Sequence, residues 1–264
     1  MSSQFIDIGV NLTNRSFNKD REEVLARAEA AGVSPLIITG TDVESSSEAA
    51  RYSKRYPGKL YSTAGVHPHD VKECGEGTLC SLRELAQQPQ VVAIGECGLD
   101  YNRDFSPRDV QRHWFREQVL LAGELGMPLF LHERDAHADF AAIMREHPAM
   151  IPRSVVHCFT GTGGELDAYL AMGFHIGITG WICDERRGQH LRELVKHIPL
   201  NRLMIETDAP YLTPRDMRPK PKDGRNEPAF LAHIAKVVAS CMGRDEDEVT
   251  QAVFETTKAF FAIP

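Results

Sequence analysis

The sequence lacks the long apolar run, of about 18 residues, that a membrane-spanning helix needs. Its first residues, Met1 to Asp7, contain neither a basic stretch nor a long apolar one, so no secretory signal is predicted. The six cysteines include no C-x-x-C pair, and in a chain of 264 residues this scatter favours reduced thiols over a disulfide framework. Low-complexity segments and internal repeats are also absent. We therefore expect a soluble, globular, cytoplasmic protein.

Acidic side chains outnumber basic ones. The formal net charge of −7 argues against a protein that coats nucleic acid non-specifically. The exception is segment 215–225, which holds five basic and two acidic side chains, a local charge of +3. One basic loop on an acidic chain suggests local capture of an anion. A solvated charged loop is the alternative, and the loop taken by itself favours that alternative.

Short apolar runs alternate with amphipathic helical patterns along the chain. The runs are nearly continuous, as expected of parallel strands buried on both faces. The predicted strands are Phe5–Leu12, Leu36–Gly40, Leu60–Val66, Val91–Gly95, Pro128–His132, Ser154–Phe159, Phe174–Ile178 and Leu203–Glu206. The predicted helices are Lys19–Ala31, Asp109–Leu125, Glu165–Met172, Gln189–His197, Pro228–Met242 and Asp247–Phe261.

Strands alternating with helices over about 250 residues have the size and rhythm of a TIM barrel. We therefore expect an α/β fold, a single (β/α)8 TIM-barrel domain over residues 1–264. A doubly wound open sheet is the runner-up, because periodicity alone does not show closure. No G-x-G-x-x-G follows the first strand, which weakens the dinucleotide-binding version of that alternative.

Polar residues appear where the apolar runs stop, and in a TIM barrel the strand ends carry the catalytic residues. These residues are Asp7, Asn11, His67, His69, Glu96, His132, His157 and Asp208. A single histidine at a strand end is more often structural than a ligand, and Glu96 has the alternative of pairing with Arg103. Glu96, His132 and His157, however, occupy equivalent positions of three successive strands, which converge in a barrel. Because imidazole plus carboxylate commonly binds divalent ions, the set favours a metal site.

Longer motifs surround these residues. They are Ala64-Gly65-Val66-His67-Pro68-His69, Ile94-Gly95-Glu96-Cys97-Gly98-Leu99-Asp100-Tyr101, Pro128-Leu129-Phe130-Leu131-His132, His157-Cys158-Phe159-Thr160-Gly161, Gly177-Ile178-Thr179-Gly180, Glu206-Thr207-Asp208-Ala209-Pro210-Tyr211-Leu212 and Arg225-Asn226-Glu227-Pro228. Through them the sequence, from Phe5 to about Leu231, resembles the TatD-type metal-dependent deoxyribonucleases of the amidohydrolase superfamily. The start Asp7-Ile8-Gly9-Val10-Asn11-Leu12 and the segment from Trp181 to Gly188 are similar to the bacterial branch that gives the family its name.

The resemblance implies a 3′→5′ exonuclease that hydrolyses phosphodiesters of single-stranded DNA and RNA in DNA repair or nucleic-acid turnover. The implied cofactor is a divalent metal, Mg²⁺ first, with Mn²⁺ or Zn²⁺ as alternatives. Carried over by position, Glu96, His132 and His157 would be metal ligands. Asp208 would be the catalytic carboxylate that also reaches the metal, and His67 would contact the scissile phosphate.

The first strand departs from the pattern of the superfamily. Most members carry Asp-x-His-x-His there, and the two histidine positions are Gly9 and Asn11 in this sequence. Glycine has no ligand atom, and an amide oxygen binds a soft divalent ion poorly. We therefore expect one tightly held ion, with any second ion weak and hydrated.

Two groups of residues are candidates for binding the nucleic-acid strand. The predicted substrate-binding residues are His69, Arg134, Lys220, Lys222 and Arg225. Arginine suits phosphate because its guanidinium donates two parallel hydrogen bonds. The aromatic residues after strand ends, candidates for stacking on bases, are Tyr101, Phe159, Trp181 and Tyr211. Core packing is the alternative for each aromatic, and we expect it for at least two.

Two other functions remain open. A metal amidohydrolase or an aminoacyl-tRNA deacylase would have a similar barrel and similar ligands, but a small-molecule hydrolase has no use for several phosphate-binding cations. A nucleic-acid-binding protein without catalysis is the third possibility, and the retained Glu96, His132, His157 and Asp208 argue against it. No coiled-coil heptads are present, so a monomer is expected.

Overall fold

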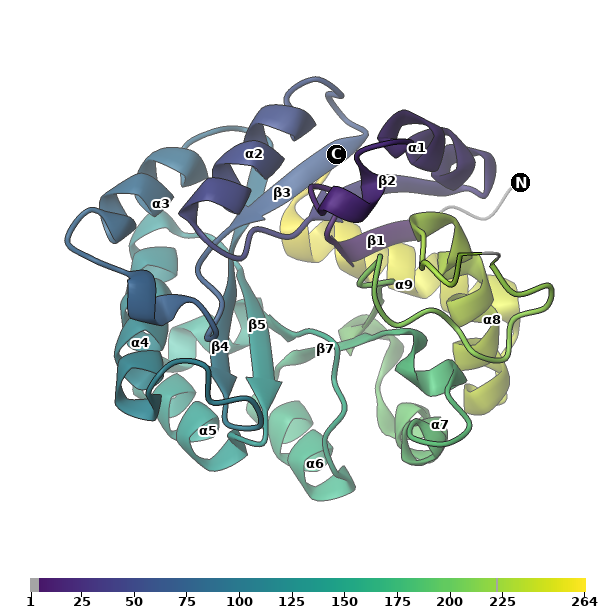
Figure 1. Ribbon diagram of the computed structural model, residues 1–264. Coiled ribbons are helices and arrows are strands. Elements are labelled where there is room, and N and C mark those ends of the chain that lie inside the picture. Colours follow the sequence, from purple (N-terminus) through teal and green to yellow (C-terminus); the bar gives the residue numbers. More distant parts are fainter. Residues whose placement is uncertain (1–4, 222) are drawn as a thin grey trace.

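The computed structural model describes residues 5–221 and 223–264 and contains a parallel eight-stranded barrel surrounded by helices (Figure 1). The strands pair in sequence order, each with the next. They are β1 (Phe5–Val10), β2 (Val33–Ile38), β3 (Leu60–Ala64), β4 (Val91–Asp100), β5 (Leu129–Arg134), β6 (Ser154–Val156), β7 (His175–Ile178) and β8 (Leu203–Ile205). The predicted TIM barrel is confirmed.

The barrel closes between the end of β1 and the segment that follows β8. The backbone N–H of Asp208 donates to the carbonyl of Gly9 at 2.8 Å, and the N–H of Asn11 donates to the carbonyl of Ala209 at 2.7 Å. Val10 and Ala209 form a parallel bridge. This closure excludes the doubly wound open sheet, and it brings Asn11 next to Asp208 at one rim.

Helices follow the strands and cover the barrel (Figure 1). They are α1 (Arg21–Ala30), α2 (Val43–Ser53), α3 (Thr78–Ala86), α4 (Arg108–Leu125), α5 (His137–Glu146), α6 (Gly163–Met172), α7 (Gln189–Leu194), α8 (Leu231–Met242) and α9 (Glu246–Phe261). Gly126 and Gly173 end α4 and α6 in the left-handed conformation, as their positions in the sequence predict. Within the described residues, none of the helices is long and apolar enough to cross a membrane.

Two apolar layers hold the barrel together. The larger one lies between the strands and the surrounding helices. The smaller one fills the barrel interior and includes Ile6 and Tyr61, near the beginnings of their strands, together with Phe261 and Ile263 from the end of the chain. The C-terminal residues therefore pack into the end of the barrel where the strands begin. Access to the interior is left at the opposite end, where the predicted site residues lie.

Candidate active site

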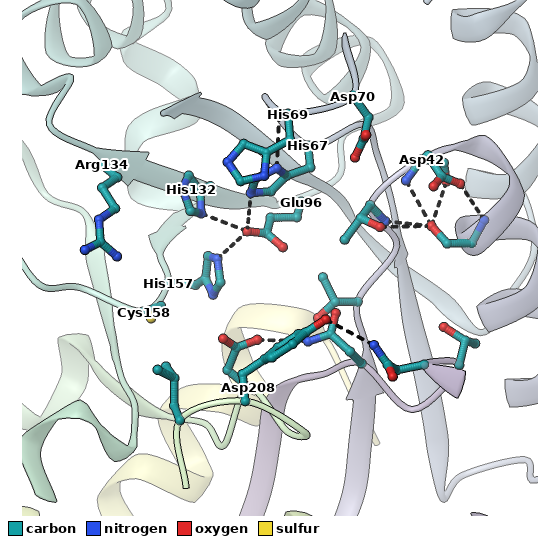
Figure 2. A pocket seen from close by; sticks show the side chains of 18 of the residues that line it. Asp42, His67, His69, Asp70, Glu96, His132, Arg134, His157, Cys158 and Asp208 are labelled. Atoms are coloured by element: carbon teal, nitrogen blue, oxygen red, sulfur yellow. Dashed lines mark hydrogen bonds and ion pairs between the residues drawn. The ribbon is translucent and has the colours of Figure 1, made fainter. Parts of the chain in front are cut away.

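Three histidines converge on a single oxygen atom of Glu96 (Figure 2). The Nε2 atom of His157 lies 2.7 Å from Glu96 Oε1, the Nδ1 atom of His132 lies 2.9 Å from it, and the Nε2 atom of His67 lies 3.3 Å from it. Glu96 and His132 belong to β4 and β5, whereas His157 and His67 follow β6 and β3. Four neighbouring strands thus direct their side chains to one point, as a closed parallel barrel allows.

Burial and mutual charge set the protonation of this cluster. Burial raises the pKa of the Glu96 carboxyl, but the neighbouring histidines, His157 first, outweigh it and hold that pKa well below its usual value. Burial lowers the pKa of His67 to about 4. For His157 burial also acts downward, but the charges of Glu96 and Glu206 outweigh it and raise the pKa well above its usual value. The carboxylate is therefore ionised and surrounded by nitrogen atoms.

The donor set fits a divalent cation. One ligand atom from each of His67, Glu96 and His132 can lie within 4.8 Å of the others, and His157 is in hydrogen-bonding contact with the same carboxylate. The Nε2 atom of His132 is buried and has no hydrogen-bond partner among the described residues. Such an unpaired donor atom is costly unless a ligand satisfies it. His67, predicted to contact phosphate, has its Nε2 atom 3.3 Å from the same Glu96 oxygen and is a further candidate ligand.

Asp208 lies across the cavity from this cluster, after β8 (Figure 2). Its Oδ1 atom accepts a hydrogen bond from the side-chain amide of Asn11 at 2.9 Å. Burial, reinforced by the charges of Glu96 and Glu206, raises the pKa of Asp208 to about 7. Its φ of 53° places a non-glycine residue in the left-handed region. Such strained positions concentrate at functional sites, and here the strain directs a carboxyl group into the cavity.

A cavity of about 730 Å³ opens above the cluster. One wall is basic and aromatic and contains Arg134 and Trp181, and Arg103 also lines the cavity. The other wall contains four carboxylates from the β2–α2 and β3–α3 connections and from α2, namely Asp42, Glu44, Glu48 and Asp70. Figure 2 shows Arg134 and Asp42 at opposite sides of the histidines. The two ends of the cavity therefore differ in charge.

Asp100, at the end of β4, is a site residue that the sequence reasoning did not select. Its Oδ2 atom lies 2.7 Å from His69 Nε2 and 3.5 Å from His132 Nε2. Burial opposes ionisation, but the nearby imidazoles of His132 and His69 lower the pKa of Asp100. His69, a predicted substrate-binding residue, lines the cavity and is oriented by this carboxylate. The position of Asp100 in the motif around Glu96 was the available signal.

The predicted phosphate-binding cations are not gathered in one place. Arg134 lines the cavity and forms no ion pair among the described residues. Lys220 is exposed and is not among the lining residues, and Lys222 lies outside the described residues. Arg225 is paired with Asp20 at 2.6 Å and with Glu227 at 2.9 Å, away from the cavity lining. This geometry gives Arg225 a structural role. Arg103, which sequence reasoning considered only as a partner of Glu96, lines the cavity instead.

The four aromatic candidates divide evenly. Trp181 and Tyr211 line the cavity, and Tyr211 is 53% exposed. The guanidinium of Arg187 lies 4.3 Å from the centre of the Trp181 ring. Phe159 is buried in the core, and Tyr101 packs against the core while its hydroxyl donates to Asp139 at 2.6 Å. The expectation that at least two of the aromatics serve packing is therefore confirmed.

Comparison with known protein families matches residues 6–262, nearly the whole chain, to the family described as TatD related DNase. The chain belongs to the TatD related DNase family. This membership confirms the resemblance seen in the sequence motifs. It also agrees with the barrel, in which those motifs fall at the strand ends around Glu96.

Relatives cover almost the whole chain. The protein named 3′-5′ ssDNA/RNA exonuclease TatD from Erwinia billingiae is 52% identical over 98% of this chain and 99% of its own length. A protein of the same name from Edwardsiella piscicida is 50% identical with the same coverage of 98% and 99%. Among solved structures, the TatD homologue YJJV from Escherichia coli superposes with a TM-score of 0.91 at 29% identity and covers 100% of both chains. A TatD family hydrolase from Entamoeba histolytica gives 0.87 at 31% identity and 98% coverage of each chain.

Proposed function

We propose that this TatD family member is a metal-dependent exonuclease that removes nucleotides from the 3′ end of single-stranded DNA and RNA, acting through one hydrolase domain over residues 1–264. The observation that carries the proposal is the convergence of His67, His132 and His157 on Glu96 inside a cavity with a basic wall. Relatives about 50% identical over nearly their full length are named for this activity.

The residues that would hold the ion are Glu96, His132 and His157, with His67 and Asp208 within reach of the same cavity. A divalent ion bound there would lower the pKa of a water molecule and draw electron density from a phosphate oxygen. We propose Mg²⁺, with Mn²⁺ and Zn²⁺ as alternatives that suit nitrogen ligands better.

The side chains supply the other parts of the reaction. The carboxyl group of Asp208 faces the cluster across the cavity and is placed to accept the proton of the attacking water. His69, held by Asp100, and the two cavity arginines Arg103 and Arg134 would donate hydrogen bonds to phosphate oxygens. Trp181 and Tyr211 offer faces on which bases stack without sequence preference.

The difference in charge between the two walls of the cavity indicates how a bound nucleic-acid strand would lie. Its phosphates would follow the side of Arg134 and Trp181, because the carboxylates of Asp42 and Asp70 repel phosphate on the other side. The terminal nucleoside would then occupy the acidic side, where hydroxyl groups but not phosphates are accepted. This arrangement agrees with removal of nucleotides from an end. A single strand also enters a cavity at a barrel mouth more easily than a rigid duplex does.

Digestion of end-labelled oligonucleotides tests the proposal. With Mg²⁺ or Mn²⁺, we expect a single strand to be shortened from its 3′ end faster than a blunt duplex, and we expect EDTA to abolish the reaction. A panel of small amides and aminoacylated tRNA serves as the comparison for the amidohydrolase and deacylase alternatives. Turnover of those substrates without phosphodiester cleavage, or equal activity in EDTA, would refute the proposal. Cytoplasmic location and the monomeric state stay predictions.

A further inference from the structure

Glu206 is a fully buried carboxylate directly behind one of the candidate ligands. It follows β8 and is 0% exposed. Its Oε2 atom lies 3.3 Å from Nδ1 of His157, on the side of the ring opposite to Glu96. Its Oε1 atom accepts a hydrogen bond of 2.6 Å from the backbone N–H of Cys158. One carboxylate therefore contacts both the His157 ring and the peptide that follows it.

The barrel provides a space for this carboxylate by leaving out two side chains. A Cβ atom at Gly9 would lie 2.4 Å from Glu206 Oε2, and one at Gly177 would lie 2.7 Å from Glu206 Oε1. Real Cβ atoms do not approach so closely, so a larger residue in place of Gly9 or Gly177 would displace the carboxylate. Gly9 stands where most of the superfamily has a first-strand histidine, and the position of Glu206 explains why no side chain fits there in this chain.

The charge of Glu206 has one available partner. Within residues 5–221 and 223–264, no lysine or arginine contacts it, and the His157 ring is the only group there able to carry positive charge against it. A buried carboxylate without a partner is strongly disfavoured. The backbone after His157 is also constrained, because Cys158 has a φ of 47° in the left-handed region. The hydrogen bond to Glu206 holds that peptide in place.

We propose that Glu206 is a positioning residue for the metal site: it accepts a hydrogen bond from Nδ1 of His157 and so presents Nε2 to Glu96 and to the ion. The inference rests on the metal site of the proposed function. Carboxylates behind ligating histidines fix the ring orientation and the protonated nitrogen, and removing one typically weakens metal affinity by about 10–100-fold. Glu206 itself does not touch substrate.

Metal titration of a Glu206→Gln variant, with Mn²⁺ as the probe, separates this role from a structural one. The glutamine keeps the size of the side chain and can still accept the Cys158 N–H, but it removes the charge behind His157. We expect the dissociation constant for Mn²⁺ to rise by about 10–100-fold, while the melting temperature of the metal-free protein does not fall. A lower melting temperature with unchanged Mn²⁺ affinity would overturn the proposal and leave Glu206 as a structural acceptor.

Three further variants serve as controls for this test. In a His157→Gln background, adding Glu206→Gln should cause no additional loss of Mn²⁺ affinity, because the effect passes through the imidazole; additive losses would refute this path. Asp184→Asn is the matched control, since this carboxylate is also buried but pairs with Arg186 and Arg187. It should change stability without changing Mn²⁺ affinity. If Glu206→Gln does not fold, Glu206→Asp, which withdraws the carboxylate from His157, should show the same weakened binding.

The oligonucleotide assay keeps this inference distinct from the proposed function. Wild-type protein that binds Mn²⁺, with the expected contrast in Glu206→Gln, supports the positioning role even where no nuclease activity is found. An active nuclease whose Mn²⁺ affinity is the same in wild-type and Glu206→Gln proteins overturns the positioning role alone.

Discussion

Arg225 and Asp20 form an ion pair of 2.6 Å that ties the end of the basic loop to the start of α1. Hydrogen bonds from Arg225, opposed by a small effect of burial and aided by Arg27, lower the pKa of Asp20 to about 2. The side chain of Arg225 is only 14% exposed and also lies over the ring of Phe17. The charge that makes segment 215–225 basic in the sequence is thus partly neutralised inside the fold.

Because Arg225 is held in this ion pair, its substitution should lower the stability of the protein and not its affinity for oligonucleotides. Arg225→Met should lower the free energy of unfolding by about 1 kcal/mol at pH 7, a value reduced for partial exposure. Because the folded pKa of Asp20 is depressed, the stabilisation is present above the unfolded pKa of about 3.9 and is lost as the pH falls toward 2. Urea unfolding of both proteins at pH 7 and pH 3 should show the difference shrinking. A raised KM for oligonucleotides with unchanged stability would contradict this view.

Arg134 should behave in the opposite way. Its guanidinium lines the cavity and forms no ion pair in the described part of the chain, so Arg134→Gln should weaken single-strand binding with little loss of stability. Losing one phosphate contact should reduce the slope of log affinity against log salt by about 0.7. Fluorescence anisotropy with a labelled oligonucleotide, in EDTA to prevent cleavage, measures this slope. Arg225→Met is the control and should keep the wild-type slope.

The barrel was readable from the sequence because its strands are continuous apolar runs, and every predicted strand overlaps an observed one. Helices α2, α3 and α5 were missed. Helix α2 is rich in serine, whose hydroxyl competes with the backbone for hydrogen bonds and so weakens the helical signal, although the helix begins at an Asp42 capping box. Closure depends on pairing between β1 and the segment after β8, about 200 residues apart, which periodicity does not report.

The metal cluster was accessible from sequence because its members end successive strands, and strand ends converge in a barrel. The place of His67 in the metal cluster, and the role of Asp100, needed the structure. His67 lies three residues beyond β3, and Asp100 is at the end of a strand that continues well past Glu96. Arg225 shows the reverse difficulty: a positive charge in a loop has the same appearance in sequence whether its partner is phosphate or Asp20.

The acidic wall predicts discrimination against a terminal phosphate. If the terminal nucleoside lies beside Asp42 and Asp70, an oligonucleotide with a 3′-phosphate should be degraded more slowly than one with a 3′-hydroxyl, by on the order of tenfold or more. Asp42→Asn combined with Asp70→Asn should reduce this ratio toward one. Asparagine still caps α2 at position 42, so the helix is preserved.

Exposed carboxylates elsewhere provide the control for total charge. Glu23→Gln combined with Glu76→Gln removes the same charge outside the cavity lining and should leave the ratio of the two rates unchanged. Equal changes in both double variants would show that the discrimination comes from the net charge of the protein and not from the wall.

Loss of either central carboxylate should stop the chemistry and leave the fold intact. Glu96→Gln should lose tightly bound metal and at least about 10²-fold in kcat, because it replaces the carboxylate on which three imidazoles converge with a neutral amide. Asp208→Asn should lose a similar factor while keeping the metal, since it removes the proton acceptor. Metal analysis and single-turnover rates distinguish loss of the ion from loss of the proton acceptor, and far-ultraviolet circular dichroism checks that both variants are folded. An Asp208→Asn protein that lost its metal would reassign Asp208 from base to ligand.

The number of ions follows from the first strand. Gly9 contributes no side chain, and the Glu206 carboxylate leaves no room for one, since a Cβ there would lie 2.4 Å from Glu206 Oε2. The amide of Asn11 donates to Asp208 and so directs its nitrogen, which is not a ligand, toward the cavity. We therefore expect one tightly held ion per chain, with a second bound weakly and recruited with the substrate phosphate. Mn²⁺ content after dialysis, together with anomalous scattering from Mn²⁺-soaked crystals, should give one full site. Two fully occupied sites about 3.5–4 Å apart would show that Asp7, Asn11 or Asp208 replaces the missing imidazoles.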